Sequence, residues 1–200
     1  MSSVASNRVL QNRGASEASR WRTVDIVVVA VLAVAFGVVF WAWSTYVWKW
    51  LSPLGEPWEY IISGMWLMPA VVAPLIVRKP GAALFAEMVA AVVSVALGSQ
   101  WGLDTLLSGF VQGAGAELIF GFTMYRNFGP IVALIAGAGA GIGEALHDIP
   151  VYFPTYAANL QFGIAGLEVI SGALIAGIGG WLLVRALRRT GALQAFPSDE

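Results

Sequence analysis

Several polar side chains that could bind a solute or carry a proton are set inside long apolar stretches of this chain. Glu87 and Glu117 interrupt two such stretches, and Gln112 lies between them in the sequence. Ionisable groups are costly in hydrocarbon, so within a membrane they usually face the interior of a helix bundle or a cavity. Each of these residues is therefore a candidate functional residue of a membrane protein.

A second group of polar residues follows towards the C-terminus. Glu144 and His147 are three residues apart, which places them on one face of a predicted helix, and Glu168 lies in the last apolar stretch. The same spacing occurs in helical metal sites. The chain has no cysteine and a single histidine, so it lacks the further ligands of such a site, and we predict neither a metal nor another cofactor.

Aromatic residues accompany these polar groups on one side of the predicted membrane domain. Tryptophan rings attract flat or cationic heterocycles, and amides and carboxylates hydrogen-bond to ring nitrogens. Taken singly, a tryptophan is more often an interfacial anchor than a ligand platform. The convergence of several such residues favours a binding site, in which Trp66 and Trp101 would sandwich or flank a flat ring. The predicted substrate-binding residues are Trp66, Gln100, Trp101, Gln112, Glu144, His147 and Glu168.

Glu87 and Glu117 are predicted to be buried carboxylates at a similar depth. Glu87 follows Lys79 by eight residues and Glu117 precedes Arg126 by nine, which places them about 12 and about 13 Å from the same membrane face. On adjacent antiparallel helices they could be neighbours that share a proton, because two close carboxylates in a low dielectric do not both ionise cheaply. The alternative is a hydrogen-bonded pair that fixes helix register.

The composition indicates a protein built for lipid. Hydrophobic residues make up 58% of the chain, charged residues 12%, and the mean hydropathy is +0.74. A soluble domain carries about a quarter charged residues. The net charge of -1 gives no bulk attraction to nucleic acid, so no nucleic-acid partner is predicted.

The apolar stretches predict an all-α membrane protein, a bundle of six transmembrane helices. The polar composition of residues 1–22 predicts a disordered cytoplasmic tail. The six-helix domain is predicted over residues 23–187, and a second cytoplasmic tail over residues 188–200. Prolines inside the second span predict a kinked or broken helix, and Pro150 and Pro154 are expected to break the chain after the fifth. The predicted spans are 24–46, 60–77, 82–97, 105–124, 128–146 and 163–185.

The distribution of Lys and Arg predicts the orientation. With six spans, ten of the basic residues fall on one side and Lys49 alone on the other, so both termini are expected to be cytoplasmic. Small residues at four-residue spacing predict close helix packing, and Glu117 and Glu168 lie in line with such seams. Both carboxylates are therefore expected to point at another helix rather than at lipid.

Six short segments together resemble the YkoE family, the substrate-binding S components of energy-coupling factor (ECF) vitamin importers associated with hydroxymethylpyrimidine and thiamin. The resemblance covers about residues 20–190. The segments are 36–41 (FGVVFW), 64–69 (GMWLMP), 78–82 (RKPGA), 86–87 (AE), 98–102 (GSQWG) and 112–117 (QGAGAE).

This resemblance implies a subunit of the prokaryotic cytoplasmic membrane that captures thiamin or its hydroxymethylpyrimidine precursor from outside. A transmembrane coupling subunit and ATP-binding-cassette ATPase subunits would then drive release inward. S components often dock through small residues on the first span, where the nearest match here is Ala33-x-x-x-Gly37.

Two functional classes other than an importer subunit are compatible with a membrane protein of this composition. A proton-coupled secondary transporter of a small heterocycle would use Glu87 and Glu117 as a relay, although no internal repeat is visible. An intramembrane enzyme is not predicted, because the chain has no G-x-S-x-G or H-E-x-x-H motif. It also lacks a phosphate-binding loop, so ATP-driven transport would need partner ATPases.

Overall fold

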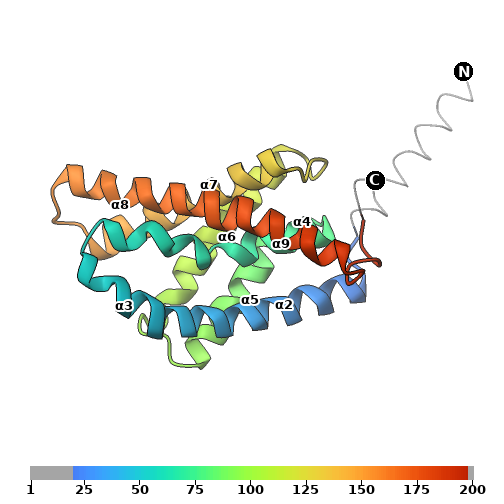
Figure 1. Ribbon diagram of the computed structural model, residues 1–200, viewed down its shortest axis with the longest axis horizontal. Helices are drawn as coiled ribbons and strands as arrows, with labels where there is room; N and C mark the ends of the chain where they lie inside the picture. The colour runs from blue at the N-terminus through green and yellow to red at the C-terminus, as the bar shows by residue number, and fades with distance from the viewer. Residues whose placement is uncertain (1–19, 198–200) are drawn as a thin grey trace, which may run out of the picture.

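The computed structural model describes residues 20–197, and over this range all the regular secondary structure is helical. The helices run mainly along one long axis, with the start of α2 and the end of α9 at one end and α3 and the start of α8 at the other (Figure 1). Most of the predicted N-terminal tail, residues 1–19, and residues 198–200 lie outside the described part of the chain.

The first span is longer than the sequence pattern predicts. Helix α2 (Thr23–Ala42) continues through a π-helical stretch, η1 (Trp43–Trp48), into α3 (Lys49–Leu51) and the 3₁₀ turn η2 (Ser52–Leu54). The rod ends only at Gly55, whose φ of 71° favours glycine. The prediction ended this span at Tyr46 because of its aromatic residues, but aromatic side chains do not themselves terminate a helix.

The second span is broken, as its prolines predict. A 3₁₀ helix, η3 (Trp58–Met65), is followed by α4 (Met68–Val77). Pro69 lies in the first turn of α4, where its missing N–H leaves no hydrogen bond unmade. Every residue of α4 is buried, so this helix forms the centre of the bundle.

The remaining helices are α5 (Ala82–Ala96), α6 (Asp104–Phe122), α7 (Pro130–Tyr152) and the rod formed by α8 (Ala158–Ser171), the π-helical η4 (Gly172–Gly179) and α9 (Gly180–Arg189). Two predicted ends are wrong. Helix α7 runs through Pro150, and the last rod begins five residues before the predicted start at Gly163.

Glycines let the helix backbones approach closely. A Cβ added to Gly137 on α7 would lie 2.2 Å from the carbonyl oxygen of Gly172, and one added to Gly64 would lie 2.2 Å from that of Ser171. Such contacts leave no space for a side chain, and they are typical of tightly packed membrane helices. They fix the position of the last rod against both α7 and η3.

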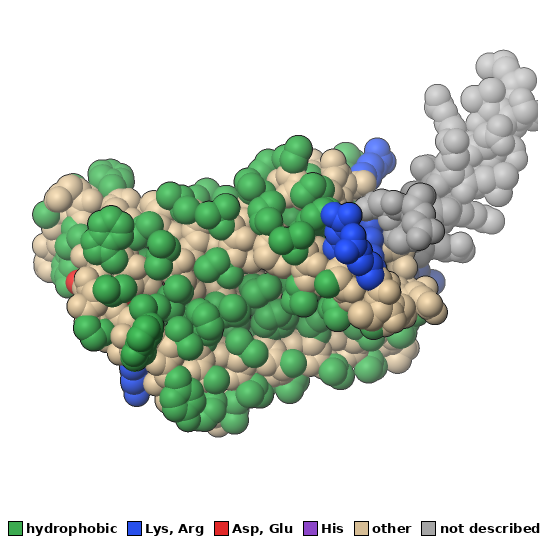
Figure 2. Space-filling model, in the orientation of Figure 1, with side chains coloured by type: hydrophobic (Ala, Val, Ile, Leu, Met, Phe, Trp, Pro, Cys, Tyr) green, Lys and Arg blue, Asp and Glu red, His purple; other side chains and the backbone are tan. Residues whose placement is uncertain are grey.

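The end of the molecule that holds both termini is basic. Arg22, Arg78, Arg126 and Arg189 lie at or beside the ends of α2, α4, α6 and α9, and Figure 2 shows most of the visible basic side chains at this end. The exposed side chains along the rest of the visible surface are predominantly hydrophobic.

The chain ends are packed more closely than the sequence predicts. The Trp21 indole N–H donates a hydrogen bond of 2.9 Å to the Pro80 carbonyl, so the predicted disordered tail extends too far by at least Trp21 and Arg22. Residues 190–197 fold back beside α2, where the Phe196 ring lies 5.8 Å from the Arg22 guanidinium.

Glu117 binds the turn between α4 and α5. Its carboxylate accepts hydrogen bonds from the backbone N–H groups of Gly81 at 2.6 Å and Ala83 at 2.9 Å, and from the Tyr125 hydroxyl. Burial, followed by the hydrogen bond to this carboxylate, raises the pKa of the Tyr125 phenol, which lies outside the spans. Glu117 is therefore a helix cap that joins α6 to the start of α5.

Replacing Glu117 by glutamine is expected to destabilise the fold by about 2–3 kcal/mol, because an amide cannot replace a charged acceptor of several N–H and O–H donors. In thermal unfolding of the purified protein this corresponds to a melting temperature about 4–12 °C lower. Ligand affinity should be unchanged, because Glu117 is not among the residues lining the cavity described below. A large loss of affinity with unchanged melting would contradict the capping role.

Candidate binding site

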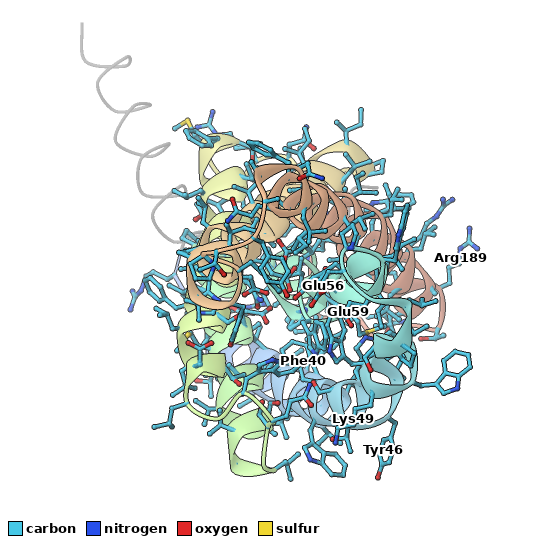
Figure 3. All side chains as sticks on the ribbon, turned by 90° about the vertical axis from the view of Figure 1, so that its left-hand side faces the viewer. Phe40, Tyr46, Lys49, Glu56, Glu59 and Arg189 are labelled. Carbon is cyan, nitrogen blue, oxygen red and sulfur yellow. The ribbon has the colours of Figure 1, made fainter. Side chains whose placement is uncertain are left out.

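A cavity of about 300 Å³ opens inside the bundle at the end opposite the basic residues. Figure 3 looks onto this end: Phe40 and Glu59 lie towards the middle of the bundle, whereas Tyr46 and Lys49 lie near its outer edge. The lining combines aromatic, carboxylate and hydroxyl side chains from six helical segments. The residues lining it are Phe40, Ser44, Trp48, Glu59, Tyr60, Trp66, Glu87, Ala91, Ser94, Ser99, Trp101, Asp104, Thr105, Ser108, Gly109, Gln112, Glu144, Asp148, Tyr152 and Phe153.

Three tryptophans form one wall of this cavity. The ring centroids of Trp48 and Trp66 are 5.0 Å apart, and those of Trp66 and Trp101 are 5.3 Å apart. Trp66 and Trp101 meet edge to face at 88°, so in this arrangement they do not sandwich a flat ring. The wall instead offers ring faces that could flank a ligand, and Tyr60 extends it at 5.2 Å from Trp48.

Carboxylates form another part of the lining. Glu87 on α5 and Glu144 on α7 are almost completely buried, and Glu59 on η3 is buried as well. One Glu87 oxygen accepts a hydrogen bond of 3.1 Å from the backbone N–H of Ala70 at the start of α4. Among the described residues, neither the other Glu87 oxygen nor Oε2 of Glu144 has a hydrogen-bond partner.

Gln112 connects α6 to this carboxylate group. Its amide nitrogen donates to the Ser108 hydroxyl at 2.8 Å and to Oε1 of Glu144 at 3.5 Å. The indole N–H of Trp66 is buried and has no hydrogen-bond partner in the part of the chain that the structure describes. Buried polar atoms normally have hydrogen-bond partners, so the unpaired acceptors and donor here are suited to a polar ligand that supplies them.

His147 lies behind the lining and is within hydrogen-bonding distance of two aspartates that line the cavity. One ring nitrogen is 2.7 Å from Asp148, and the other is 3.2 Å from Asp104 at the start of α6. The Tyr152 hydroxyl donates a second hydrogen bond to Asp104. This network joins the outer ends of α6 and α7 beside the cavity.

The structure brings most of the predicted substrate-binding residues together. Trp66, Trp101, Gln112 and Glu144 line the cavity, whereas His147 lies in its second layer. Glu168 also lies behind the lining, completely buried on α8 and beside Glu144 and Asp148.

Other predicted residues lie elsewhere. Gln100 is exposed on the turn before α6 and is not part of the lining. Ala33 and Gly37 are both buried, and a Cβ on Gly37 would lie 2.7 Å from the Ala90 carbonyl oxygen. In this structure these two residues pack against the chain itself, so a docking role for them remains a prediction that this placement does not favour.

Glu87 and Glu117 are not the pair that their equal depth suggested. Glu117 caps the start of α5, whereas Glu87 reaches α4 and the cavity. The carboxyl group near enough to Glu87 to interact with it electrostatically is that of Glu144, not that of Glu117. Depth along a helix does not specify the direction in which a side chain points.

The sequence reasoning missed Glu59, Tyr60 and Trp48 as parts of the site. Glu59 and Trp48 lie between the predicted spans 24–46 and 60–77, but η3 and η1 turn them inward. A signal was available at Glu59, because a carboxylate directly precedes an apolar stretch that also contains Tyr60 and Ser63. No comparable signal marks Trp48 among its neighbouring tryptophans.

Comparisons with known proteins agree with this architecture. A family model described as "ABC-type cobalt transport system, permease component" matches residues 24–143. The putative HMP/thiamine permease protein YkoE of Bacillus subtilis (strain 168) is 33% identical over 178 residues, which cover 88% of this chain and 89% of that protein. A solved structure described as the crystal structure of an S-component of ECF transporter has a TM-score of 0.84 at 31% identity, covering 88% of this chain and 90% of that one.

The fold is thus that of an ECF-transporter S component, a class of multi-pass membrane proteins. The chain belongs to the YkoE family within this class.

Proposed function

We propose that this chain is the substrate-capture subunit of an ATP-driven ECF-type importer, and that it binds thiamin or its hydroxymethylpyrimidine precursor from the outer side of the membrane. The observation that carries the proposal is the cavity, which is lined both by tryptophans and by buried carboxylates whose oxygens lack partners among the described residues. Aromatic faces and carboxylates together suit a flat cationic heterocycle. The relative from Bacillus subtilis, described as a putative HMP/thiamine permease, supports this choice of ligand.

The orientation is part of the proposal. In the described part of the chain, five helices are long and apolar enough to cross a membrane. Helix α5, with 15 residues, spans about 22 Å against a hydrocarbon core of about 30 Å. We propose α5 as a sixth, short crossing. Both termini then lie at the basic, cytoplasmic end, and the cavity opens towards the outside.

The proposed residue roles follow from the lining. Trp48, Trp66 and Trp101 would flank the heterocycle, and Glu144 with Gln112 would hydrogen-bond to its ring nitrogens or amine. Glu59 and Glu87 would add negative charge around a cation. The energy for release would come from a coupling subunit and ABC ATPases, since the chain contains no phosphate-binding loop.

Replacing Trp101 by alanine is expected to weaken binding of thiamin about 10–100-fold, because stacking or cation–π contact with one aromatic ring contributes about 1–3 kcal/mol. Isothermal titration calorimetry on the detergent-solubilised protein measures this. The matched control is Trp50→Ala: Trp50 is on the same rod as Trp48 but is 79% exposed, so its removal should leave affinity unchanged. Equal affinities of the two variants would contradict the proposed wall.

A proton-coupled secondary transporter is the second candidate, favoured by the buried carboxylates near the cavity. Uptake into vesicles that contain this chain without any ATPase separates the two functions. The proposed function predicts no pH-driven uptake, whereas accumulation of solute down a proton gradient would establish the secondary transporter.

A further inference from the structure

Glu168 is the carboxyl group near the cavity with the least stabilisation of its charge. It lies on α8 with a relative exposure of 0%. Neither of its oxygens accepts a hydrogen bond from a donor group of the described residues, and the side chain that it meets is the carboxyl group of Asp148. Its neighbours differ in this respect, because Glu144 accepts a hydrogen bond from Gln112 and Asp148 is paired with His147.

The charged surroundings of Glu168 are almost entirely negative. Its electrostatic neighbours on α7 are Glu144 and Asp148, and His147, the only basic group of this cluster in the described chain, is already bonded to two aspartates. The segment η4, which continues the same rod, carries no titratable residue. The other titratable groups around the cavity are Glu59 and Tyr60 on η3, Glu87 on α5, Asp104 on α6 and Tyr152 on α7.

The carboxyl groups of Glu144, Asp148 and Glu168 are not all ionised at once in a buried site. Each added charge costs desolvation and repels its neighbours, so the least supported carboxyl keeps its proton. By position and partners, that carboxyl is Glu168. Glu144 and Asp148, which line the cavity, each have a hydrogen-bond donor that can support a charge, Gln112 and His147 respectively.

We propose that Glu168 is a proton-binding site coupled to the cavity, so that a cationic ligand and the proton on Glu168 exclude each other. Burial first, and then repulsion by Glu144 and Asp148, keep Glu168 neutral; the ligand's positive charge would offset that repulsion and favour the ionised form of Glu168. The O–H bond of Glu168 then breaks and the proton passes to water. One positive charge enters as one leaves, so the net charge of the site is unchanged.

The proposal rests on the proposed function for the nature of the ligand, and it goes further by linking binding to pH. A cation should bind with release of a proton, and its affinity should rise about tenfold for each pH unit over the range in which the free protein holds that proton. An uncharged ligand in the same cavity should release none, because it leaves the repulsion in place.

The test is calorimetry on the full chain in detergent, with each titration repeated in two buffers of different ionisation enthalpy. Thiamin, a permanent cation, and hydroxymethylpyrimidine, uncharged in mildly alkaline buffer, are the probes. We expect release of about one proton with thiamin and none with hydroxymethylpyrimidine. Glu168→Gln, which is neutral at every pH, should bind thiamin without proton release and with a flat pH profile.

Glu56→Gln is the matched control, because Glu56 is an exposed carboxylate at the same end of the molecule. It should release the proton like the unmodified protein. Thiamin binding without proton release by the unmodified chain would overturn the proton site while leaving the proposed function standing. Proton release that persists in Glu168→Gln would place the proton on another group and overturn the assignment. If neither thiamin nor hydroxymethylpyrimidine binds, the result would instead refute the proposed function itself.

Discussion

Glu144→Gln is expected to weaken thiamin binding about 100-fold, equivalent to about 2.7 kcal/mol. Glu144 is 3% exposed, its Oε1 accepts a hydrogen bond from Gln112, and its Oε2 has no partner among the described residues. The substitution keeps the shape of the side chain but removes the charge that would face a bound cation. Titration calorimetry of the purified variant measures the change.

The controls for this prediction separate charge from folding. Glu56→Gln removes an exposed carboxylate from the same end of the protein and should leave the affinity unchanged. The melting temperature of Glu144→Gln should not fall, because a neutral amide relieves repulsion among buried carboxylates. An affinity within threefold of the unmodified protein would show that Glu144 does not contact the ligand.

Gly137→Ala is expected to produce the largest loss of stability. A Cβ at this position would lie 2.2 Å from the Gly172 carbonyl oxygen and 2.7 Å from the Gly177 backbone nitrogen. Both obstructing atoms belong to backbone, which cannot turn aside as a flexible side chain can. We expect destabilisation of about 3 kcal/mol or more, and a melting temperature at least about 6–12 °C lower, from the forced separation of α7 and η4.

Gly166→Ala is the matched comparison for this substitution. Gly166 lies in the middle of α8, and a Cβ there would meet no atom within 4 Å. Alanine is favoured over glycine inside a helix by about 0.5–1 kcal/mol, so this variant should melt at the same temperature or slightly higher. Similar melting of the two variants would mean that the close contact of α7 with η4 does not hold the bundle together.

Much of the helical architecture follows from hydropathy, but the helix ends do not. The apolar stretches located all the long helices but not α3 and η2, which lie between the first two predicted spans, and the prolines located the break between η3 and α4. Pro150 was expected to end α7, yet the helix continues to Tyr152. A proline removes one hydrogen bond, and neighbouring helices in a membrane bundle can compensate for that loss.

The site was partly predictable for a similar reason. Carboxylates within apolar sequence point inward because lipid excludes them, and this identified Glu144 and Glu168. Trp48 could not be placed, because a π-helical turn changes the face on which the following residues lie. The contact of His147 with Asp104 spans 43 positions, and no local pattern specifies such a pairing.

Direct binding to the purified, detergent-solubilised chain tests the central claim. The titrations would use thiamin and hydroxymethylpyrimidine, with riboflavin and biotin as controls and no ATPase present. We predict saturable binding of at least one of the two pyrimidine compounds and none of the controls, as the cavity of tryptophans and carboxylates requires. Failure of both pyrimidine compounds to bind, or equal binding of riboflavin or biotin, would contradict the account of this chain as a capture subunit for that ligand class.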